Sequence, residues 1–163
     1  MIVIGVISDT HLPENLQIFP EILLDGLQKV DFIIHAGDIN RGFVAYDLGE
    51  IAPLQGVAGN TDDDFILSIF GRKKILEIEG CKIGIIHGDG NSGTTLSRVQ
   101  MAFEKDNVDC VVFGHSHIPY NEVIDGVLYF NPGSPFDKRK QEKYSFGELI
   151  VTGNRIEGKL QYF

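Results

Sequence analysis

The 163-residue sequence contains no tryptophan and few basic residues, 14 lysines and arginines against 23 aspartates and glutamates. The formal charge of -9 leaves no broad cationic face for a nucleic-acid backbone, so we expect no binding of duplex nucleic acid. A local cationic centre, such as bound metal, could still attract a small phosphate to an acidic protein.

Cysteine is also scarce. Cys81 and Cys110 lie far apart and neither belongs to a Cys-x-x-Cys pair, which argues against a thiolate zinc site. A redox pair is one interpretation. We favour two small buried hydrophobic side chains, because Cys110 begins an apolar run that ends at Phe113. Such cysteines suit a reducing compartment.

No apolar run of the sequence is long enough to cross a bilayer. The first run, from Ile2 to Ser8, has no basic segment before it and no cleavage site of small residues after it. Internal repeats, low-complexity tracts and long linkers are absent as well. With 43% hydrophobic and 23% charged residues, we expect residues 1–163 to form a single cytoplasmic domain that does not contact a membrane.

Strand-like apolar runs alternate with helical patterns in the first two thirds of the chain. The sequence predicts strands at 2–8, 32–35, 54–58, 75–78, 82–86 and 110–113, and helices at 13–29, 42–50 and 94–105. In the last third it predicts strands at 120–124, 127–131, 145–152 and 155–162, with hairpin turns at Asp125-Gly126 and Gly153-Asn154. This order suggests two packed sheets with helices outside.

Polar side chains follow five of these strands at their carboxyl ends, where ligands bind in open α/β sheets. The segments are Asp9-Thr10-His11, Gly37-Asp38, Gly59-Asn60, His87-Gly88 and Gly114-His115-Ser116-His117. Each segment alone also fits a helix cap or a turn. Together they hold four of the five histidines of the chain, which favours a common site.

The spacing within two segments supports that interpretation. Residues two positions apart in extended chain point the same way, so Asp9 with His11, and His115 with His117, can each direct two ligands to one point. Carboxylate, imidazole and amide oxygen together suit Mn, Fe, Co, Ni or Zn rather than Ca. The candidates, about right for two ions with a shared ligand, are Asp9, His11, Asp38, Asn60, His87, His115 and His117.

This ordered series resembles the signature of the calcineurin-like metallophosphoesterases. Further along, Asn131-Pro132-Gly133-Ser134 resembles their small single-domain phosphodiesterase branch, although we interpret it here as a structural turn. The resemblance implies an α/β fold, a four-layer α/β-β/α sandwich of two mixed sheets flanked by helices. It also implies two divalent metal ions, with manganese expected first and nickel, cobalt, iron or zinc as alternatives.

By that resemblance, each ion has four ligands and Asp38 bridges the two ions. The first ion would be held by Asp9, His11, Asp38 and His117. The second would be held by Asp38, Asn60, His87 and His115.

The implied activity is hydrolysis of a small phosphoester, and of a phosphodiester in particular. A hydroxide that bridges the ions would attack phosphorus in line, and the residues assigned to catalysis are Asp38, Asn60 and His115. Many larger members carry a histidine directly after the asparagine as a proton donor, and here that residue is Thr61. Because a threonine hydroxyl is a poor acid, we expect leaving groups of high pKa to react slowly.

Alternatives stay open for the function. The family includes a retromer subunit that uses the fold as a protein-binding scaffold with a degraded metal site, whereas the complete ligand set here favours catalysis. The run Gly88–Gly93 contains a Gly-x-Gly-x-x-Gly pattern, but the next strand ends in Gly114-His115 without the expected acidic residue, and Thr94 stands where a phosphate loop has lysine. We favour a glycine loop beside the metals.

Three further features have more than one interpretation. His35 lies inside an apolar run and is interpreted as a core residue or a support for a ligand, rather than as a ligand. Asp62 is a second candidate support. The apolar stretch from Phe65 to Phe70 fits core, a wall of the substrate site, or a contact within a homo-oligomer.

Overall fold

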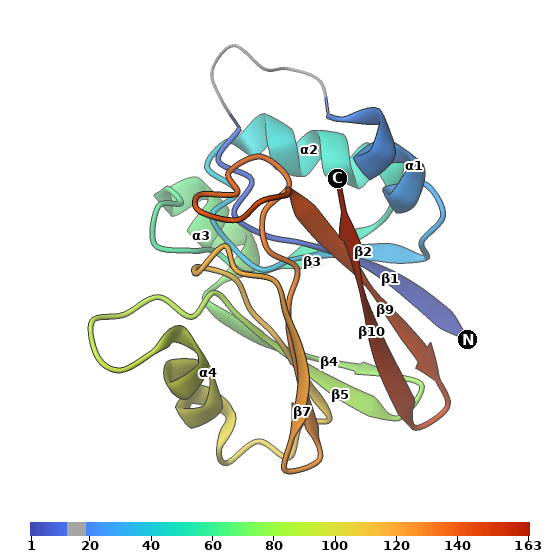
Figure 1. Ribbon diagram of the computed structural model, residues 1–163, viewed down its shortest axis with the longest axis vertical. Coiled ribbons are helices and arrows are strands. Elements are labelled where there is room, and N and C mark those ends of the chain that lie inside the picture. Colours follow the sequence, from blue (N-terminus) through green and yellow to red (C-terminus); the bar gives the residue numbers. More distant parts are fainter. Residues whose placement is uncertain (13–18) are drawn as a thin grey trace.

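The structure is a computed structural model that describes residues 1–12 and 19–163. Two five-stranded sheets pack face to face, and helices cover their outer sides (Figure 1). The helices are α1 (Glu21–Leu27), α2 (Gly42–Ile51), α3 (Asp64–Phe70) and α4 (Thr95–Phe103). The predicted four-layer α/β-β/α sandwich is therefore confirmed.

The first sheet has the strand order β10-β9-β1-β2-β3. Its strands are β1 (Ile2–Ile7), β2 (Phe32–His35), β3 (Leu54–Gly56), β9 (Ser145–Thr152) and β10 (Arg155–Tyr162). The strands β1, β2 and β3 run parallel, because helices connect them, whereas β9 and β10 form an antiparallel hairpin that joins β1 from the other side.

The second sheet has the order β4-β5-β6-β8-β7. Its strands are β4 (Lys73–Ile78), β5 (Cys81–Ile86), β6 (Cys110–Val112), β7 (Tyr120–Ile124) and β8 (Val127–Asn131). β5, β6 and β8 are parallel, and β4 and β7 pair antiparallel at the two edges. Each sheet thus contains three adjacent parallel strands, and the loops of interest follow their carboxyl ends.

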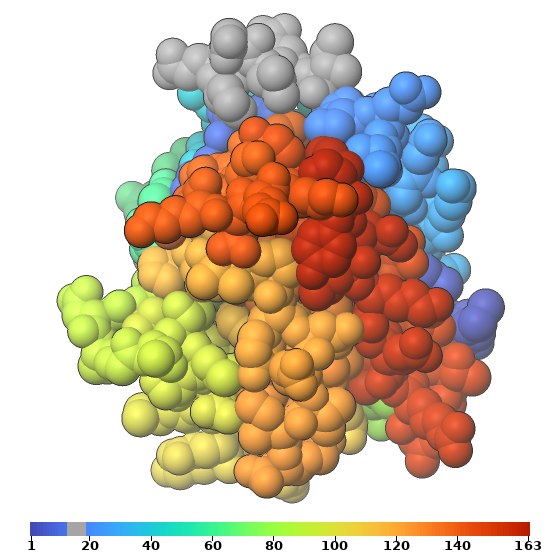
Figure 2. All heavy atoms as spheres, in the orientation of Figure 1, coloured from blue at the N-terminus to red at the C-terminus, as the bar shows by residue number. Residues whose placement is uncertain are grey.

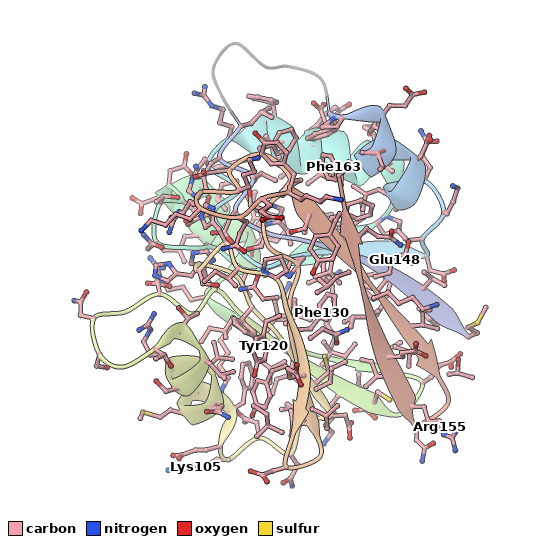
Figure 3. The ribbon with its side chains drawn as sticks, in the orientation of Figure 1. Lys105, Tyr120, Phe130, Glu148, Arg155 and Phe163 are labelled. Carbon is pink, nitrogen blue, oxygen red and sulfur yellow. The ribbon has the colours of Figure 1, made fainter. Side chains whose placement is uncertain are left out.

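The main core lies between the sheets and is built from alternate residues of the central strands. Ile4 and Val6 of β1 pack in the same cluster as Ile83 and Ile85 of β5, while Ile7 faces the helices. The ring of Phe130, labelled in Figure 3 between the sheets, fills space left by two glycines of β9 and β10.

The two cysteines lie in this intersheet core. Cys81 and Cys110 are buried and both are free thiols, which confirms the prediction of small buried hydrophobic side chains. Burial raises the pKa of both thiols, so neither is an activated nucleophile.

Two helices differ from the sequence prediction. The helix predicted at 13–29 begins only at Glu21, because Pro20 immediately before it has an extended ψ of 139° and a residue before proline avoids helical backbone. The part of that prediction at 13–18 lies outside the described residues. Asp63 and Asp64 predict the start of a helix without its extent, and the apolar stretch 65–70 that follows them forms most of α3.

The helix α3 serves both core and surface. Asp63 accepts a hydrogen bond from the backbone N–H of Ile66 and so begins the helix, and the side chain of Ile66 is buried. Phe65 and Ile69 are instead exposed on the outer face. A homo-oligomer through this face stays a prediction. Among the described helices, none combines the length and the apolar character that a membrane crossing requires.

Candidate metal centre

Five loops meet at one end of the two sheets. They follow β1, β2 and β3 in the first sheet and β5 and β6 in the second, so the parallel strands of both sheets deliver their carboxyl ends to the same place (Figure 1). Hydrogen bonds join the loops within and between the sheets. The backbone N–H of Asp9 donates to Gly37 O of the same sheet at 3.0 Å, and that of His115, from the second sheet, donates to Asp9 Oδ2 at 2.9 Å.

Two aspartates lie at the centre of these loops, surrounded by imidazoles. Asp9 Oδ1 lies 3.3 Å from His117 Nε2, 3.7 Å from His87 Nε2 and 3.9 Å from His11 Nε2. Asp38 Oδ2 lies 3.2 Å from His11 Nε2 and 3.3 Å from His87 Nε2. Each carboxylate therefore sits between rings contributed by different loops.

Four of these atoms are buried and lack any hydrogen bond within the described part of the chain: Asp9 Oδ1 and the Nε2 atoms of His11, His87 and His117. Leaving one buried polar atom without a partner costs about 1–3 kcal/mol. Four such atoms in one place therefore indicate a site where a bound ligand supplies the missing partner. All four face the same small volume. Carboxylate oxygens and imidazole nitrogens so arranged fit divalent metal ions.

The ligand atoms fall into two groups. Asp9, His11 and His117 form one and Asp9, Asp38 and His87 form the other, with the atoms of each group within 4.8 Å of one another. Asp9 is thus common to both groups, whereas the family resemblance places Asp38 as the bridge. Because Asp38 Oδ2 also approaches His11 closely, both carboxylates lie between the two groups.

The two other candidates lie beside these groups. The ring of His115 stands edge-on to that of His87, with centroids 5.3 Å apart. Asn60 is exposed on a turn whose neighbours contact Asp38: the backbone N–H of Thr61 donates to Asp38 Oδ1 at 3.0 Å. The structure therefore brings five candidates into direct proximity and places His115 and Asn60 next to them.

The backbone at the site is strained. The φ angles of five candidate residues lie in the left-handed region, at 53° for Asp9, 32° for His11, 57° for Asp38, 67° for His115 and 58° for His117. This conformation costs non-glycine residues on the order of 1–2 kcal/mol each. Strain concentrated on the candidate ligands indicates that their directions are imposed by the surrounding structure.

Hydrogen bonds on the far side of the rings set their orientation. His87 donates from Nδ1 to Ala36 O at 2.8 Å, and His117 donates from Nδ1 to Asp137 O. Because Nδ1 donates a hydrogen bond in both rings, each neutral ring would offer the lone pair of Nε2 to a cation beside the carboxylates. Nδ1 of His11 contacts the side-chain amide of Asn40 at 2.6 Å.

The pKa values of the central groups depend on one another. Burial by itself raises the pKa of Asp9 and of Asp38, but the neighbouring imidazoles outweigh it and hold both below the usual range. Burial lowers the pKa of His87, yet Asp38 and Asp9 outweigh it and raise the pKa to about 9. Without metal, protons on the imidazoles balance the negative charge of the two carboxylates. A bound cation would replace these protons.

His35 supports two of the loops and belongs to neither ligand group. Gly37 N–H donates to its Nδ1 at 3.1 Å, so Nε2 carries the proton and donates to Thr10 Oγ1 at 3.2 Å. Thr10 in turn donates to Asp38 O at 3.2 Å. Burial lowers the pKa of His35 to about 4 and keeps the ring neutral. The sequence interpretation of His35 as a support fits this geometry.

Asp62 joins its own loop, after β3, to the loop after β2. One of its carboxylate oxygens accepts from Asn40 N–H at 2.6 Å and the other from Gly59 N–H at 2.8 Å. Asn40 had no place in the sequence prediction. Its position two residues after Asp38 is the signal that the sequence offers, and it is not specific. In the structure Asn40 has a φ of 65°, like the candidate ligands around it.

The glycine-rich loop after β5 is wrapped around an arginine. Arg98 donates from Nε to Gly88 O at 3.0 Å and from Nη1 to Ser92 O at 2.9 Å and Gly93 O at 3.1 Å. A Cβ at Gly90 would lie only 2.7 Å from Arg98 Cδ. A Cβ at Gly88 or Gly93 would instead meet side chains of α4, at 3.0 Å from Thr95 Cγ2 and 2.5 Å from Ser97 Oγ. Close packing against Arg98 and α4 therefore accounts for these glycines without a bound nucleotide.

The chain is similar in sequence to proteins that are named as metallophosphoesterases, which agrees with a metal site at the loop end. Residues 2–154 match the calcineurin-like phosphoesterase superfamily domain. A probable metallophosphoesterase of Methanocaldococcus jannaschii is 38% identical over 159 residues, which cover 96% of this chain and 79% of that protein. A phosphodiesterase of the same organism is 32% identical over 144 residues, covering 80% of this chain and 82% of the relative.

The fold has counterparts among solved structures. The crystal structure of Vps29 from Chaetomium thermophilum superposes with a TM-score of 0.81 at 17% identity, covering 100% of this chain and 97% of that one. At that identity the likeness concerns the fold alone. Together with the extent of the domain match and the carboxylate and imidazole cluster at the loop end, these findings show that the chain belongs to the calcineurin-like phosphoesterase superfamily.

Proposed function

We propose that this protein is a phosphodiesterase that depends on two divalent metal ions held by Asp9, His11, Asp38, Asn60, His87, His115 and His117. The observation that carries the proposal is the set of four buried ligand atoms without hydrogen bonds, which face one another between the loops. The 32% identical relative named as a phosphodiesterase supports the reaction class. Manganese is the ion proposed first, with nickel, cobalt, iron and zinc as alternatives, and the cytoplasm is the proposed compartment.

Bound divalent ions supply a water of lowered pKa and a positive field for the phosphoryl oxygens. Asp9 and Asp38 contribute the negative charge that retains the ions, and Ala36 O and Asp137 O keep the rings of His87 and His117 turned toward them. Among these proposed ligands, Asp38, Asn60 and His115 are the residues that we assign to catalysis.

The surroundings of Thr61 favour diesters with good leaving groups. Its hydroxyl donates to Asn40 Oδ1 at 2.5 Å, and the same amide contacts His11. The hydroxyl proton is therefore already used in a hydrogen bond and does not point to a leaving group. A threonine hydroxyl is in any case a poor acid. Leaving alcohols of high pKa, including those of most phosphomonoesters, are therefore expected to depart slowly.

The decisive experiment measures hydrolysis of an aryl phosphodiester by Mn²⁺-loaded protein. We expect Asp38→Asn to lower turnover by about a thousandfold or more, because the amide removes a negative charge between the two ligand groups. The matched control is Asp31→Asn, since Asp31 also accepts a backbone N–H, from Val3 at 2.7 Å, but belongs to neither ligand group. Unchanged turnover in Asp38→Asn would refute the proposal.

The scaffold alternative predicts a different outcome. The fold likeness to Vps29 and the exposed side chains of Phe65 and Ile69 on α3 are the observations behind it. If the loaded wild-type protein hydrolyses no phosphomonoester, phosphodiester or cyclic nucleotide with any of the five metals, the scaffold becomes the better account.

A further inference from the structure

The segment from Asn131 to Asp137 connects β8 of the second sheet to the approach to β9 of the first, and it passes over the loop end of the molecule. Residues 131–135 of the segment are buried, and Figure 2 shows the chain that follows it in deep orange on the upper part of the visible face, beside red atoms of the C-terminal strand β10. The sequence suggested no more than a structural turn here. The segment nevertheless contacts two of the loops that carry candidate ligands, the loop after β1 and the loop after β6.

Ser134 contacts the backbone of a residue common to both ligand groups. Its side chain is buried, and its hydroxyl donates to Asp9 O at 2.7 Å. The same Oγ accepts from Asp137 N–H at 2.8 Å. Since Asp9 N–H donates to Gly37 O, the strained Asp9 is held by hydrogen bonds on both sides.

Asn131 holds the loop that carries His115. Its side chain is fully buried, and its amide donates from Nδ2 to Gly114 O at 2.9 Å and to Ser116 Oγ at 3.1 Å. Its Oδ1 accepts from Gly133 N–H at 2.9 Å, which fixes the amide orientation. The two residues that flank His115 are therefore both tied to one side chain.

The end of the segment reaches His117. The carbonyl of Asp137 accepts from His117 Nδ1, and Ser134 Oγ holds the N–H of Asp137 in turn. The hydroxyl of Ser134 is thus bonded to Asp9 directly and to the ring of His117 through Asp137. These two residues supply Oδ1 and Nε2 atoms that lie 3.3 Å apart in the same ligand group.

We propose that the Asn131–Asp137 segment is a clamp that aligns the metal ligands, with Asn131 and Ser134 as positioning residues that contact no substrate. The inference rests on the metal binding of the proposed function. The hydroxyl of Ser134 offsets the tendency of Asp9 to leave the left-handed region, and the amide of Asn131 holds the Gly114–Ser116 backbone across from it. Without the clamp the ligands are present but less well aligned.

The chain offers a matched pair of serines for the test. Ser134 and Ser145 are both buried, and each donates from Oγ to a backbone carbonyl at 2.7 Å. The backbone N–H of Ser145 also donates to Ser134 O at 3.0 Å. The acceptor is Asp9 O for Ser134 and Pro132 O for Ser145. Alanine removes one equivalent hydrogen bond in each case, but only Ser134→Ala releases a candidate ligand.

The measurement is Mn²⁺ affinity by competition with a chelator, together with thermal unfolding of the metal-free proteins. We expect similar unfolding temperatures for Ser134→Ala and Ser145→Ala, and a loss of Mn²⁺ affinity of about tenfold or more for Ser134→Ala only. Ser145→Ala should stay within about twofold of wild type. Asn131→Asp, which replaces the donor by an oxygen facing Gly114 O, should also lose affinity while metal-free protein remains folded.

Wild-type Mn²⁺ affinity in Ser134→Ala would overturn the clamp. This outcome is distinct from failure of the proposed function. If wild type hydrolyses no ester but the serine variants still differ in affinity, the clamp stands and the phosphodiesterase proposal falls. If wild type binds no Mn²⁺ or other divalent metal, both are overturned.

Discussion

The two ends of the sheets use the same unusual backbone conformation for different purposes. At the carboxyl ends of the parallel strands, the left-handed residues include Asp9, Asp38 and His117, which are buried and face one another. At the opposite end they include Glu79 and Asp125, which simply reverse the chain in exposed hairpin turns. Positive φ therefore directs ligands at one end and closes turns at the other.

Glycines show the same contrast. A Cβ at Gly114, at the loop end of β6, would lie 1.9 Å from Ser8 Oγ and 2.6 Å from Asp9 Oδ2. A Cβ at Gly126, in a hairpin at the other end, would meet nothing within 4 Å. The first glycine makes room for a carboxylate, while the second only permits a φ of 84°. The loop end is thus packed against its polar groups as tightly as a core.

The largest effect that separates the two ends is expected for Gly114→Ala against Gly126→Ala. The methyl group at 114 must displace Ser8 or Asp9, so we expect destabilisation by about 1–3 kcal/mol. The shift of Asp9, shared by both ligand groups, should also lower Mn²⁺ affinity by roughly a hundredfold. At 126 the cost is only that of alanine at positive φ, about 1 kcal/mol, with unchanged Mn²⁺ affinity.

Chelator competition and urea unfolding on both variants check this prediction. If Gly114→Ala retains wild-type Mn²⁺ affinity, Asp9 is not a ligand or its position is not constrained. If Gly126→Ala loses affinity, the two ends are coupled and the contrast between them fails.

The hairpin end was the easier end to predict. The turn Asp125-Gly126 follows from its two residues alone, because aspartate and glycine both tolerate the conformation of a tight turn. The approximate position of the metal site was also accessible, since the carboxyl ends of parallel strands share one edge. That rule places Asp9 and Asp38 together without knowledge of any side-chain contact.

The support of the site was not predictable. Ser134 lies 125 residues from Asp9, and its short motif fits an ordinary turn equally well. Asp62 appeared only as one of three consecutive aspartates, and its contact with Asn40 depends on how two loops meet. Long-range polar contacts of this kind leave no periodic signal in the sequence. The grouping of ligand atoms around Asp9 is beyond sequence reasoning for the same reason.

A second prediction concerns the pH dependence of the metal-free protein. The pKa of His87 rises from 6.5 to about 9 on folding, so its contribution to stability is present below pH 6.5 and is lost as the pH rises through 9. The pKa of His35 falls from 6.5 to about 4, so stability also declines as the pH falls from 6.5 to 4. Stability should therefore be greatest near pH 6.5, with changes on the order of a few kcal/mol on either side.

Bound Mn²⁺ should raise the pH at which the protein is most stable, because His87 must be neutral to bind an ion. Urea unfolding across pH 5 to 9 with and without Mn²⁺ measures the shift. We expect little stabilisation by Mn²⁺ below about pH 6 and a clear one at pH 8. Equal metal content after dialysis at pH 5 and pH 8 would contradict the assignment of histidine ligands. His35→Gln, which keeps a buried polar side chain without titration, should remove the acid limb alone.

The smallest effect is expected at the far end of β6, the strand that leads to His115. Asp109 precedes this strand and accepts from Lys82 N–H at 2.7 Å. Asp109→Ala should cost about 1 kcal/mol in urea unfolding, because Asp109 is exposed and water replaces the lost acceptor. Mn²⁺ affinity should not change, since Gly114 is held independently by His87 O and Asn131. A loss of affinity would show that the strand transmits displacement from one end to the other, and the clamp would then be only one of two constraints on the His115 loop.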